Sequence, residues 1–297
     1  MTTGPKARRS LVGLALAASV GAVALIAFSP VEVGAASSAG RERALVGEAR
    51  RGSVTVQLAP AVEDVAVSGR AGRPVIVIDP GHGGRDPGAT AVSGTVSEKQ
   101  LTLALAKELR DLLVERGRVR VALTREDDRS LSLEQRASIA RRLGASMFLS
   151  LHMDAAPNPL ARGASVYSLS DVASDADAAR FARAENRSND SVVSEVDGRA
   201  QAILSDLALR EQMIVSAGLA ERVIRKASGR VLMRPEPHRH AAFHVLRRAE
   251  VPAVLFEAGY ISNADDELML RSAEHRHKLV LALAQAIEAD VAARSRR

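Results

Sequence analysis

Residues 75–89 read V-I-V-I-D-P-G-H-G-G-R-D-P-G-A, and the architecture can be inferred from them first. Four β-branched residues (75–78) are followed at once by a segment dense in Asp, Pro and Gly. A buried strand of a parallel sheet has this pattern where it leaves the sheet at its carboxyl edge. Since ligands bind at that edge in open α/β sheets, we expect an α/β fold with its functional site here.

His82 lies within this turn, between Gly81 and the pair Gly83-Gly84. Glycines adopt backbone conformations that other residues avoid, and they let a ligand or ion approach closely. A histidine held in this way is a candidate metal ligand or catalytic base. It is equally an ordinary loop residue unless partners for it occur elsewhere in the chain.

The composition narrows the function. The 297 residues include no cysteine, so any metal must be held by histidines and carboxylates. The net charge of +6 invites a nucleic-acid interpretation, but charges of both signs are mixed along the helical segments and aromatic residues make up only 2%. Stacking platforms for bases are therefore lacking, and we expect no nucleic-acid partner. The mild basicity fits weak attraction to an anionic surface such as a cell envelope.

Residues 1–36 have the pattern of a secretory signal peptide. Lys6, Arg8 and Arg9 precede an uncharged apolar run (11–28), and small residues follow it. The arginine pair also fits a twin-arginine signal, and an uncleaved membrane anchor is the alternative. We therefore expect export by the Sec or the twin-arginine route to the periplasm or the extracellular cell envelope, with membrane contact only through this segment.

The rest of the chain divides into a short polar segment and one domain. Residues 37–73 are rich in Gly and Arg and are too few for an independent domain, so we interpret them as a linker with at most an edge hairpin. Residues 74–294 are enough for one α/β domain of ordinary size.

Glu98 begins a predicted helix. Ser97 is a natural N-cap, Gln100 completes a capping box, and Gly117 closes the helix. In a strand–helix unit this start lies near the carboxyl edge of the preceding strand. The ordinary explanation for Glu98 is the helix dipole, which favours an acid in the first turn.

His152 and Glu257 each follow a predicted buried strand, and so they fall at the same edge as His82. A buried carboxylate such as Glu257 is costly without a cation or hydrogen-bond partners. The predicted strands are residues 119–124, 147–151, 164–168, 243–246 and 251–256, and the further helices are residues 132–143 and 272–293.

Residues 171–228 contain no β-branched run and show helical periodicity. We predict a helical insertion of about 55 residues, long enough to be a lid or regulatory element. Plain surface helices explain the periodicity equally well.

His82, Glu98, His152 and Glu257 thus form a predicted constellation. Two imidazoles and one carboxylate make a three-ligand zinc set that leaves a fourth position open. Zinc lowers the pKa of water toward about 7, and a second carboxylate can then transfer the proton to a leaving amine. The same set fits iron, but the spare carboxylate favours hydrolysis.

Four motifs resemble the zinc-dependent N-acetylmuramoyl-L-alanine amidases of the cell-wall type. They are D-P-G-H-G-G (79–84), S-E-K (97–99), S-L-H-M-D (150–154) and L-F-E-A-G-Y-I-S-N (255–263). The resemblance implies that His82, Glu98 and His152 bind Zn²⁺ and that Glu257 is catalytic. It implies a twisted, mostly parallel sheet flanked by helices on both faces. The implied reaction is hydrolysis of the amide between N-acetylmuramic acid and L-alanine in peptidoglycan, in cell separation or wall turnover.

The insertion resembles that of the family's division amidases. There a helix blocks the site with a glutamate until an activator with a LytM-like domain displaces it. The resemblance implies Glu185 as the blocking residue, with Glu195 as the second candidate, and a LytM-domain activator as a partner. We expect a monomer.

The sequence also departs from the family pattern. The space before Val75 is too small for the wall-targeting β-domain of larger relatives. His238, His240 and His244 lie near a predicted strand end, and we favour surface positions for them over substrate binding. A zinc peptidase of wall peptides and a non-catalytic wall-binding scaffold remain as alternative functions.

Overall fold

The computed structural model describes residues 65–187 and 199–295, with side chains of the second range from residue 206 onward. The chain separates into two compact units: Met1–Thr55, which lies outside the described residues, and Val56–Arg297, which contains all of them. The predicted signal peptide, most of the predicted linker and Glu195 are therefore outside the described part. Along the described ranges, no helix combines the length and the apolar composition needed to cross a bilayer.

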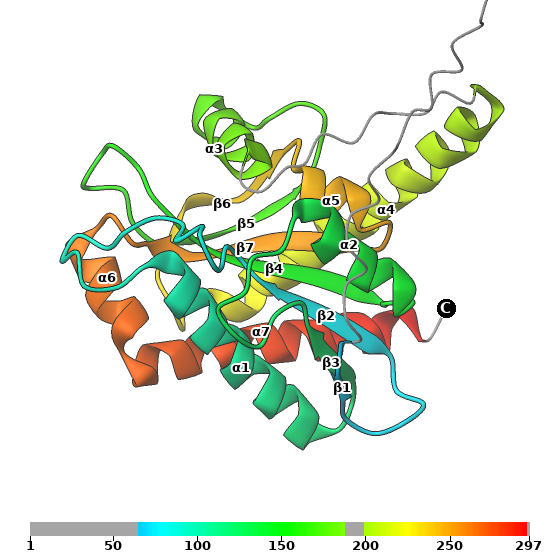
Figure 1. Cartoon of the computed structure of the whole chain (residues 1–297), viewed down its shortest axis with the longest axis horizontal. Helices are drawn as coiled ribbons and strands as arrows, with labels where there is room; N and C mark the ends of the chain where they lie inside the picture. Colours follow the sequence, from blue (N-terminus) through cyan, green and yellow to red (C-terminus); the bar gives the residue numbers. More distant parts are fainter. Residues whose placement is uncertain (1–64, 188–198, 296–297) are drawn as a thin grey trace, which may run out of the picture. The chain divides into compact units, whose positions relative to one another are not determined.

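A seven-stranded sheet forms the centre of the domain, with strand order β1-β3-β2-β4-β7-β5-β6 (Figure 1). Neighbours among β3, β2, β4 and β7 are parallel, whereas β1 and β5 run antiparallel to their partners β3 and β7. The mostly parallel sheet predicted from the sequence is thus confirmed. The strands are β1 (Val67–Ser68), β2 (Val75–Pro80), β3 (Arg120–Leu123), β4 (Met147–Asp154), β5 (Ala164–Leu169), β6 (Met233–Ala241) and β7 (Ala253–Tyr260).

Helices cover both faces of the sheet, because strand residues alternate between two apolar cores. One core lies between the sheet and α1, the C-terminal part of α4, α6 and α7; the other lies between the sheet and α2, α3 and α5. The helices are α1 (Glu98–Arg116), α2 (Leu133–Arg142), α3 (Ala176–Arg187), α4 (Arg199–Ala227), α5 (His244–Arg248), α6 (Ala264–Arg271) and α7 (Ala273–Arg294).

The start of α1 is fixed by the capping box predicted from the sequence. The backbone N–H of Ser97 donates to Oε1 of Gln100 over 2.9 Å, and Gly117 ends the helix with a left-handed φ of 66°. A capping box satisfies backbone donors that the first helical turn leaves unpaired. It therefore holds Glu98 in the first turn, directly beside the carboxyl edge of β2.

One predicted strand is wrong. Residues 243–246 do not form a strand: Phe243 is the N-cap of the short helix α5, and the strand in this region is β6, which precedes it. β6 contains Pro, Arg and His and only half-buried or exposed positions along most of its length, so it carries no apolar run. The apolar residues that suggested a strand are instead buried on one side of α5, and a run this short has no decisive period.

The predicted helical insertion is helical where it is described, as α3 and α4. Its far end is not peripheral, because Leu219, Ala220 and Val223 on α4 are buried in the core that α7 also covers. α6 was not expected from the sequence.

Candidate metal centre and catalytic site

Two strand ends bring His82 and His152 together. His82 follows β2, and His152 lies on β4, the neighbouring parallel strand, which is longer than predicted and ends at Asp154. The two ring centroids are 4.9 Å apart, with the rings edge to face. On the far side of β4, Glu257 of β7 lies directly opposite His152 in the strand register. Three of the four predicted residues therefore meet along adjacent strands.

Glu98 turns inward from α1 and lies between the two histidines. Its Oε1 atom is 3.0 Å from Nε2 of His82 and 3.0 Å from Nδ1 of His152. The backbone N–H groups of Met153 and Ala89 donate to its two oxygens over 3.0 Å and 2.9 Å. The side chain is 3% exposed, so these contacts replace its solvation.

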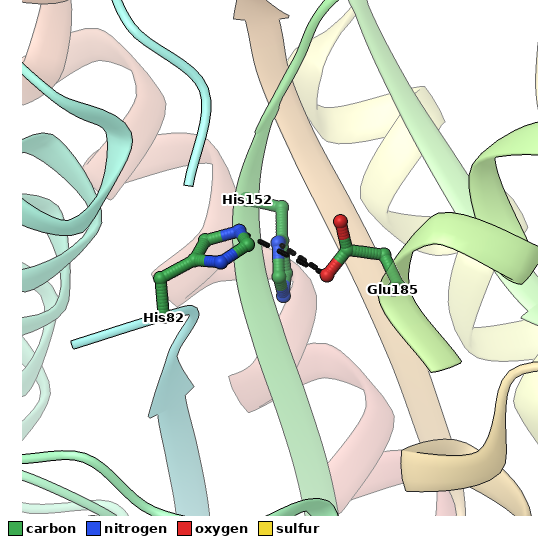
Figure 2. A group of neighbouring side chains, drawn as sticks. All are labelled: His82, His152 and Glu185. Carbon is green, nitrogen blue, oxygen red and sulfur yellow. Dashed lines mark ion pairs between the residues drawn. The ribbon is translucent and has the colours of Figure 1, made fainter. Parts of the chain in front are cut away.

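Glu185, on α3, points toward the imidazole rings of His82 and His152 (Figure 2). Its Oε2 atom lies 3.6 Å from Nδ1 of His152 and 3.8 Å from Nε2 of His82. One ligand atom from each of these three residues falls within 4.8 Å of the others. The structure thus places Glu185, the first candidate for a blocking residue, at the histidine pair.

These donor atoms fit a small metal ion. Zinc bonds to nitrogen and carboxylate oxygen are about 2.0–2.2 Å long, so two ligands of a tetrahedral zinc lie roughly 3.4 Å apart. The four distances from Glu98 and Glu185 to the imidazole nitrogens, 3.0 to 3.8 Å, bracket this separation. In addition, Nε2 of His82 is buried and makes no hydrogen bond, although Glu98 is near it. The site therefore has the donor set and the spacing for a divalent ion such as zinc.

Neighbouring groups orient His82. Its backbone is left-handed, with φ at 61°, which is uncommon for a residue other than glycine. Its Nδ1 atom lies 2.9 Å from a carboxylate oxygen of Asp86, and its carbonyl accepts a hydrogen bond of 2.7 Å from Arg136. A carboxylate on the second ring nitrogen fixes the tautomer of a metal-binding histidine. Asp86 is thus a site residue that the sequence reasoning missed.

Two buried arginines hold the turn that carries His82. Arg125 donates to the carbonyl of Pro80 over 3.0 Å and of Gly81 over 2.8 Å. Arg136 donates to the Pro80 carbonyl and to the Asp79 carboxylate, both over 2.8 Å. Burial raises the pKa of Asp79, but the charge of Arg136 together with the hydrogen bonds from Thr124 and Arg136 outweighs burial, and the pKa is lowered. The sequence signal for this network was Arg136 itself, a charged residue on the apolar side of a predicted helix.

Two glycines leave room for the side chains of His82, Glu98 and His152. A Cβ atom on Gly81 would lie 2.4 Å from Cε1 of His152. On Gly88, which has a φ of 66°, it would lie 2.5 Å from Oε2 of Glu98 and 2.6 Å from Cδ2 of His82. Real Cβ atoms do not approach other atoms so closely, and therefore both positions require glycine.

Burial and neighbouring charges shift the pKa values of the cluster in opposite directions. Burial lowers the pKa of His82, but the carboxylates of Glu98 and Asp86 outweigh it and raise it to about 11. Burial raises the pKa of Glu98, yet His82 and His152 outweigh it and the pKa falls well below its usual range. For Glu185 burial prevails over the two histidines, and the pKa is raised. Glu98 is therefore the carboxylate that stays ionised in this site.

Glu257 is fully buried, and neither of its oxygens has a hydrogen-bond partner among the described residues. Burial raises its pKa well above the ordinary value, and the nearby carboxylates of Asp154, Glu98 and Glu185 raise it further. A carboxyl group in such surroundings binds a proton readily, which suits proton transfer at neutral pH.

The three additional histidines, His238, His240 and His244, are all half-buried rather than exposed. Nε2 of His238 lies 3.0 Å from the Ser168 hydroxyl on β5. The backbone N–H of His244 donates to the side chain of Asn186, whose amide donates in turn to the carbonyl of Ala242. These two hydrogen bonds hold Asn186, the residue that follows Glu185. His244 therefore helps to position α3 through its backbone N–H and not through its ring.

Comparison with known proteins identifies the family. Residues 76–289 match the family model of N-acetylmuramoyl-L-alanine amidases. N-acetylmuramoyl-L-alanine amidase AmiA of Escherichia coli (strain K12) is 36% identical over 220 residues, which are 73% of this chain and 75% of AmiA. AmiC of Escherichia coli O6:H1 is 30% identical over 263 residues, 86% of this chain and 63% of AmiC.

Solved structures agree. The catalytic domain of CwlV, an N-acetylmuramoyl-L-alanine amidase from Bacillus (Paenibacillus) polymyxa var. colistinus, superposes with a TM-score of 0.53 and 27% identity over 72% of this chain and 96% of the domain. AmiC2 of Nostoc punctiforme gives a TM-score of 0.52 and 27% identity over 76% and 99% of the two chains. The residues matched by the family model, 76–289, include β3, β4, β5, β6, β7 and nearly all of β2, together with the cluster of histidines and glutamates, and the chain therefore belongs to the N-acetylmuramoyl-L-alanine amidase family.

Proposed function

We propose that the chain is a zinc-dependent amidase that hydrolyses the bond between the lactyl group of N-acetylmuramic acid and L-alanine in peptidoglycan. The observation that carries this proposal is the convergence of Oε1 of Glu98 on both imidazoles at 3.0 Å. His82, Glu98 and His152 would hold the ion, as their spacing favours. When bound, zinc supplies Lewis-acid chemistry: it polarises an amide carbonyl and lowers the pKa of water.

Glu257 is the proposed proton carrier. It accepts a proton from the attacking water and delivers it to the nitrogen of the departing alanine. Its raised pKa and its lack of hydrogen-bond partners among the described residues support this role, because the protonated form must exist within the catalytic cycle. Glu98, with its lowered pKa, is unsuited to carry protons and suited to bind a cation.

Glu185 is proposed to hold the site closed. Its carboxylate lies where a fourth ligand would bind, 3.6 and 3.8 Å from the imidazole nitrogens. The helix that carries it is anchored by Phe181, whose ring packs 5.4 Å from Tyr167 and 5.5 Å from Phe243. Substrate would enter only after α3 moves, which a LytM-domain activator protein could cause. Glu195, the second candidate, lies outside the described residues.

We infer further that residues 1–36 are a signal peptide that directs export of the chain, and that residues 37–73 are a linker to the catalytic domain, residues 74–294. Its place would be the periplasm or the extracellular envelope, as a monomer acting on peptidoglycan in cell separation or wall turnover. The signal-like sequence pattern supports the export, and the family membership supports the wall substrate.

One digestion separates this function from its two alternatives. Purified peptidoglycan is incubated with the zinc-loaded chain, with and without a chelator, and the products are identified by mass spectrometry. Free stem peptides that begin with alanine, absent with chelator, support the amidase. Trimmed peptides still attached to muramic acid would indicate a zinc peptidase, and binding without products would indicate a scaffold.

A further inference from the structure

A cavity of about 580 Å³ opens beside the metal centre, at the ends of β4 and β7. We call it the Arg234 cleft; Asn158, Arg162, Arg180, Arg234 and Tyr260 are among the residues that line it. Tyr260 is paired with Asp154 just beyond the pair His152–Glu257. Because a strand advances about 3.3 Å per residue, the pair Asp154–Tyr260 lies roughly 7–10 Å from the pair His152–Glu257, two residues along β4 and three along β7.

The three arginines of the cleft differ in what they bind. Arg162 is paired with Asp265 over 2.7 Å, and Arg180 with Asp177 over 2.8 Å. Arg234 has no carboxylate within 4.0 Å in the part of the chain that the structure describes. One of its nitrogens, Nη1, donates to the hydroxyl of Tyr260 over 2.6 Å, and the guanidinium lies 5.8 Å from the ring centre of the same residue.

Tyr260 thus holds the guanidinium of Arg234 in place and leaves most of its five N–H groups without a partner among the described residues. A guanidinium presents two parallel donors to a carboxylate, and such charge-assisted pairs are roughly twice as strong as neutral hydrogen bonds. The Asp154 carboxylate acts on Arg234 only at longer range, from the far side of the Tyr260 hydroxyl. A half-buried arginine that is oriented by a neighbour and has no carboxylate in direct contact is prepared to bind one.

The proposed substrate offers an anion on one side of the bond only. The lactyl carboxyl is consumed in the amide, so the sugar half carries no charge beside it. The peptide half ends in a carboxylate whatever its sequence. An extended peptide advances at most about 3.3–3.6 Å per residue, so a carboxylate two or three residues beyond the released alanine would reach a cleft roughly 7–10 Å away.

We propose that Arg234 binds a carboxylate of the peptide half of the substrate and thereby makes the enzyme selective for acidic peptides. This inference rests on the proposed amidase function, since it takes the position of the scissile bond from the metal centre. Arg180 lines the cleft from α3, the helix that carries Glu185. A movement of α3 that frees the metal centre would therefore also open the cleft.

The test compares two substrates that differ only in charge. Soluble muramyl peptides are prepared from peptidoglycan, and half of the sample is treated with carbodiimide and ammonia, which converts the peptide carboxylates to neutral amides. Initial rates are measured for the zinc-loaded chain and for its Glu185→Ala variant, so that a closed site cannot conceal cleavage. Arg234→Gln is made in both chains. Arg225→Gln, an exposed arginine on α4 paired with Glu221, is the matched control.

We expect kcat/KM for the acidic substrate to exceed that for the amidated one by about tenfold or more, as for loss of a hydrogen bond to a charged group. In Arg234→Gln this preference should fall to within twofold while cleavage of the amidated substrate is retained; Arg225→Gln should keep the preference. Equal cleavage of both substrates by the parent chain, or a preference that survives Arg234→Gln, would overturn the inference and leave the amidase function standing. No cleavage of either substrate by any variant would refute both.

Discussion

Replacing Arg136 tests whether the turn that carries His82 is held by a buried ion pair. Arg136 is 3% exposed, and its guanidinium bonds the Asp79 carboxylate and the carbonyls of Pro80 and His82 over 2.7–2.8 Å. Arg136→Met keeps much of the side-chain volume and leaves Asp79 buried without this cation. Breaking a buried pair in this way costs about 3–5 kcal/mol. Since hydroxyls of Thr124 and Ser150 still donate to Asp79, we expect about 3 kcal/mol.

Arg136→Met should also weaken zinc binding, because the carbonyl of His82 loses its hydrogen bond from Arg136, and the backbone of His82 has an uncommon left-handed φ. Loss of a group that orients a metal ligand typically costs ten- to hundredfold in affinity. The assays are urea unfolding in the presence of chelator, which reports the free energy of unfolding without metal, and zinc titration against a competing chelator.

Two further variants control this experiment. In Asp79→Asn/Arg136→Met both charges are absent, so the destabilisation should be smaller than the sum of the two single changes by about 1 kcal/mol or more. Arg225→Met, on an exposed pair, should change stability by less than about 1 kcal/mol. A cost below about 1 kcal/mol for Arg136→Met, with unchanged zinc affinity, would show that the turn does not depend on this pair.

Three other changes test the site itself. Glu257→Gln should retain zinc at one ion per chain and lose turnover, whereas His82→Ala should lose zinc; metal analysis beside peptidoglycan digestion checks both, and full activity of Glu257→Gln would remove it as proton carrier. Glu185→Ala should raise the rate measured without activator by about tenfold or more, since the carboxylate no longer competes for the ion; an unchanged rate would exclude it as the blocking residue. The lowered pKa of Asp79 contributes stability that is present above its unfolded-state pKa of about 3.9 and is lost as pH falls through the folded-state value, so unfolding at about pH 2–5 should show a steep acid limb that Asp79→Asn flattens.

Much of the fold could be predicted because its signals are local. The capping box around Ser97 and the β-branched run at the start of β2 depend on a few adjacent residues, and both elements form as expected. β6 could not be found, since a half-exposed strand rich in charge and Pro carries no apolar period. α5 was misinterpreted because three buried apolar positions fit a strand and a helix equally well.

The site was predictable to a different degree. His82, His152 and Glu257 each follow a predicted strand, a pattern visible in the chain. The structure places His82 just after β2 and the other two on the adjacent strands β4 and β7. The network of Asp79, Arg125 and Arg136 was missed, because its bonds join residues up to 57 positions apart and only the folded backbone brings them together. The sequence also could not show that Arg234 has no carboxylate in direct contact among the described residues, because only the folded chain determines which carboxylates lie near it.

His82, Glu98 and His152 are proposed to hold one divalent ion, and anomalous diffraction from zinc-loaded crystals at the zinc absorption edge measures this without an intermediate assay. We predict one strong peak about 2.0–2.2 Å from Nε2 of His82, Nδ1 of His152 and a carboxylate oxygen of Glu98. A peak elsewhere, or Glu98 turned away from the ion, would contradict the proposed metal centre.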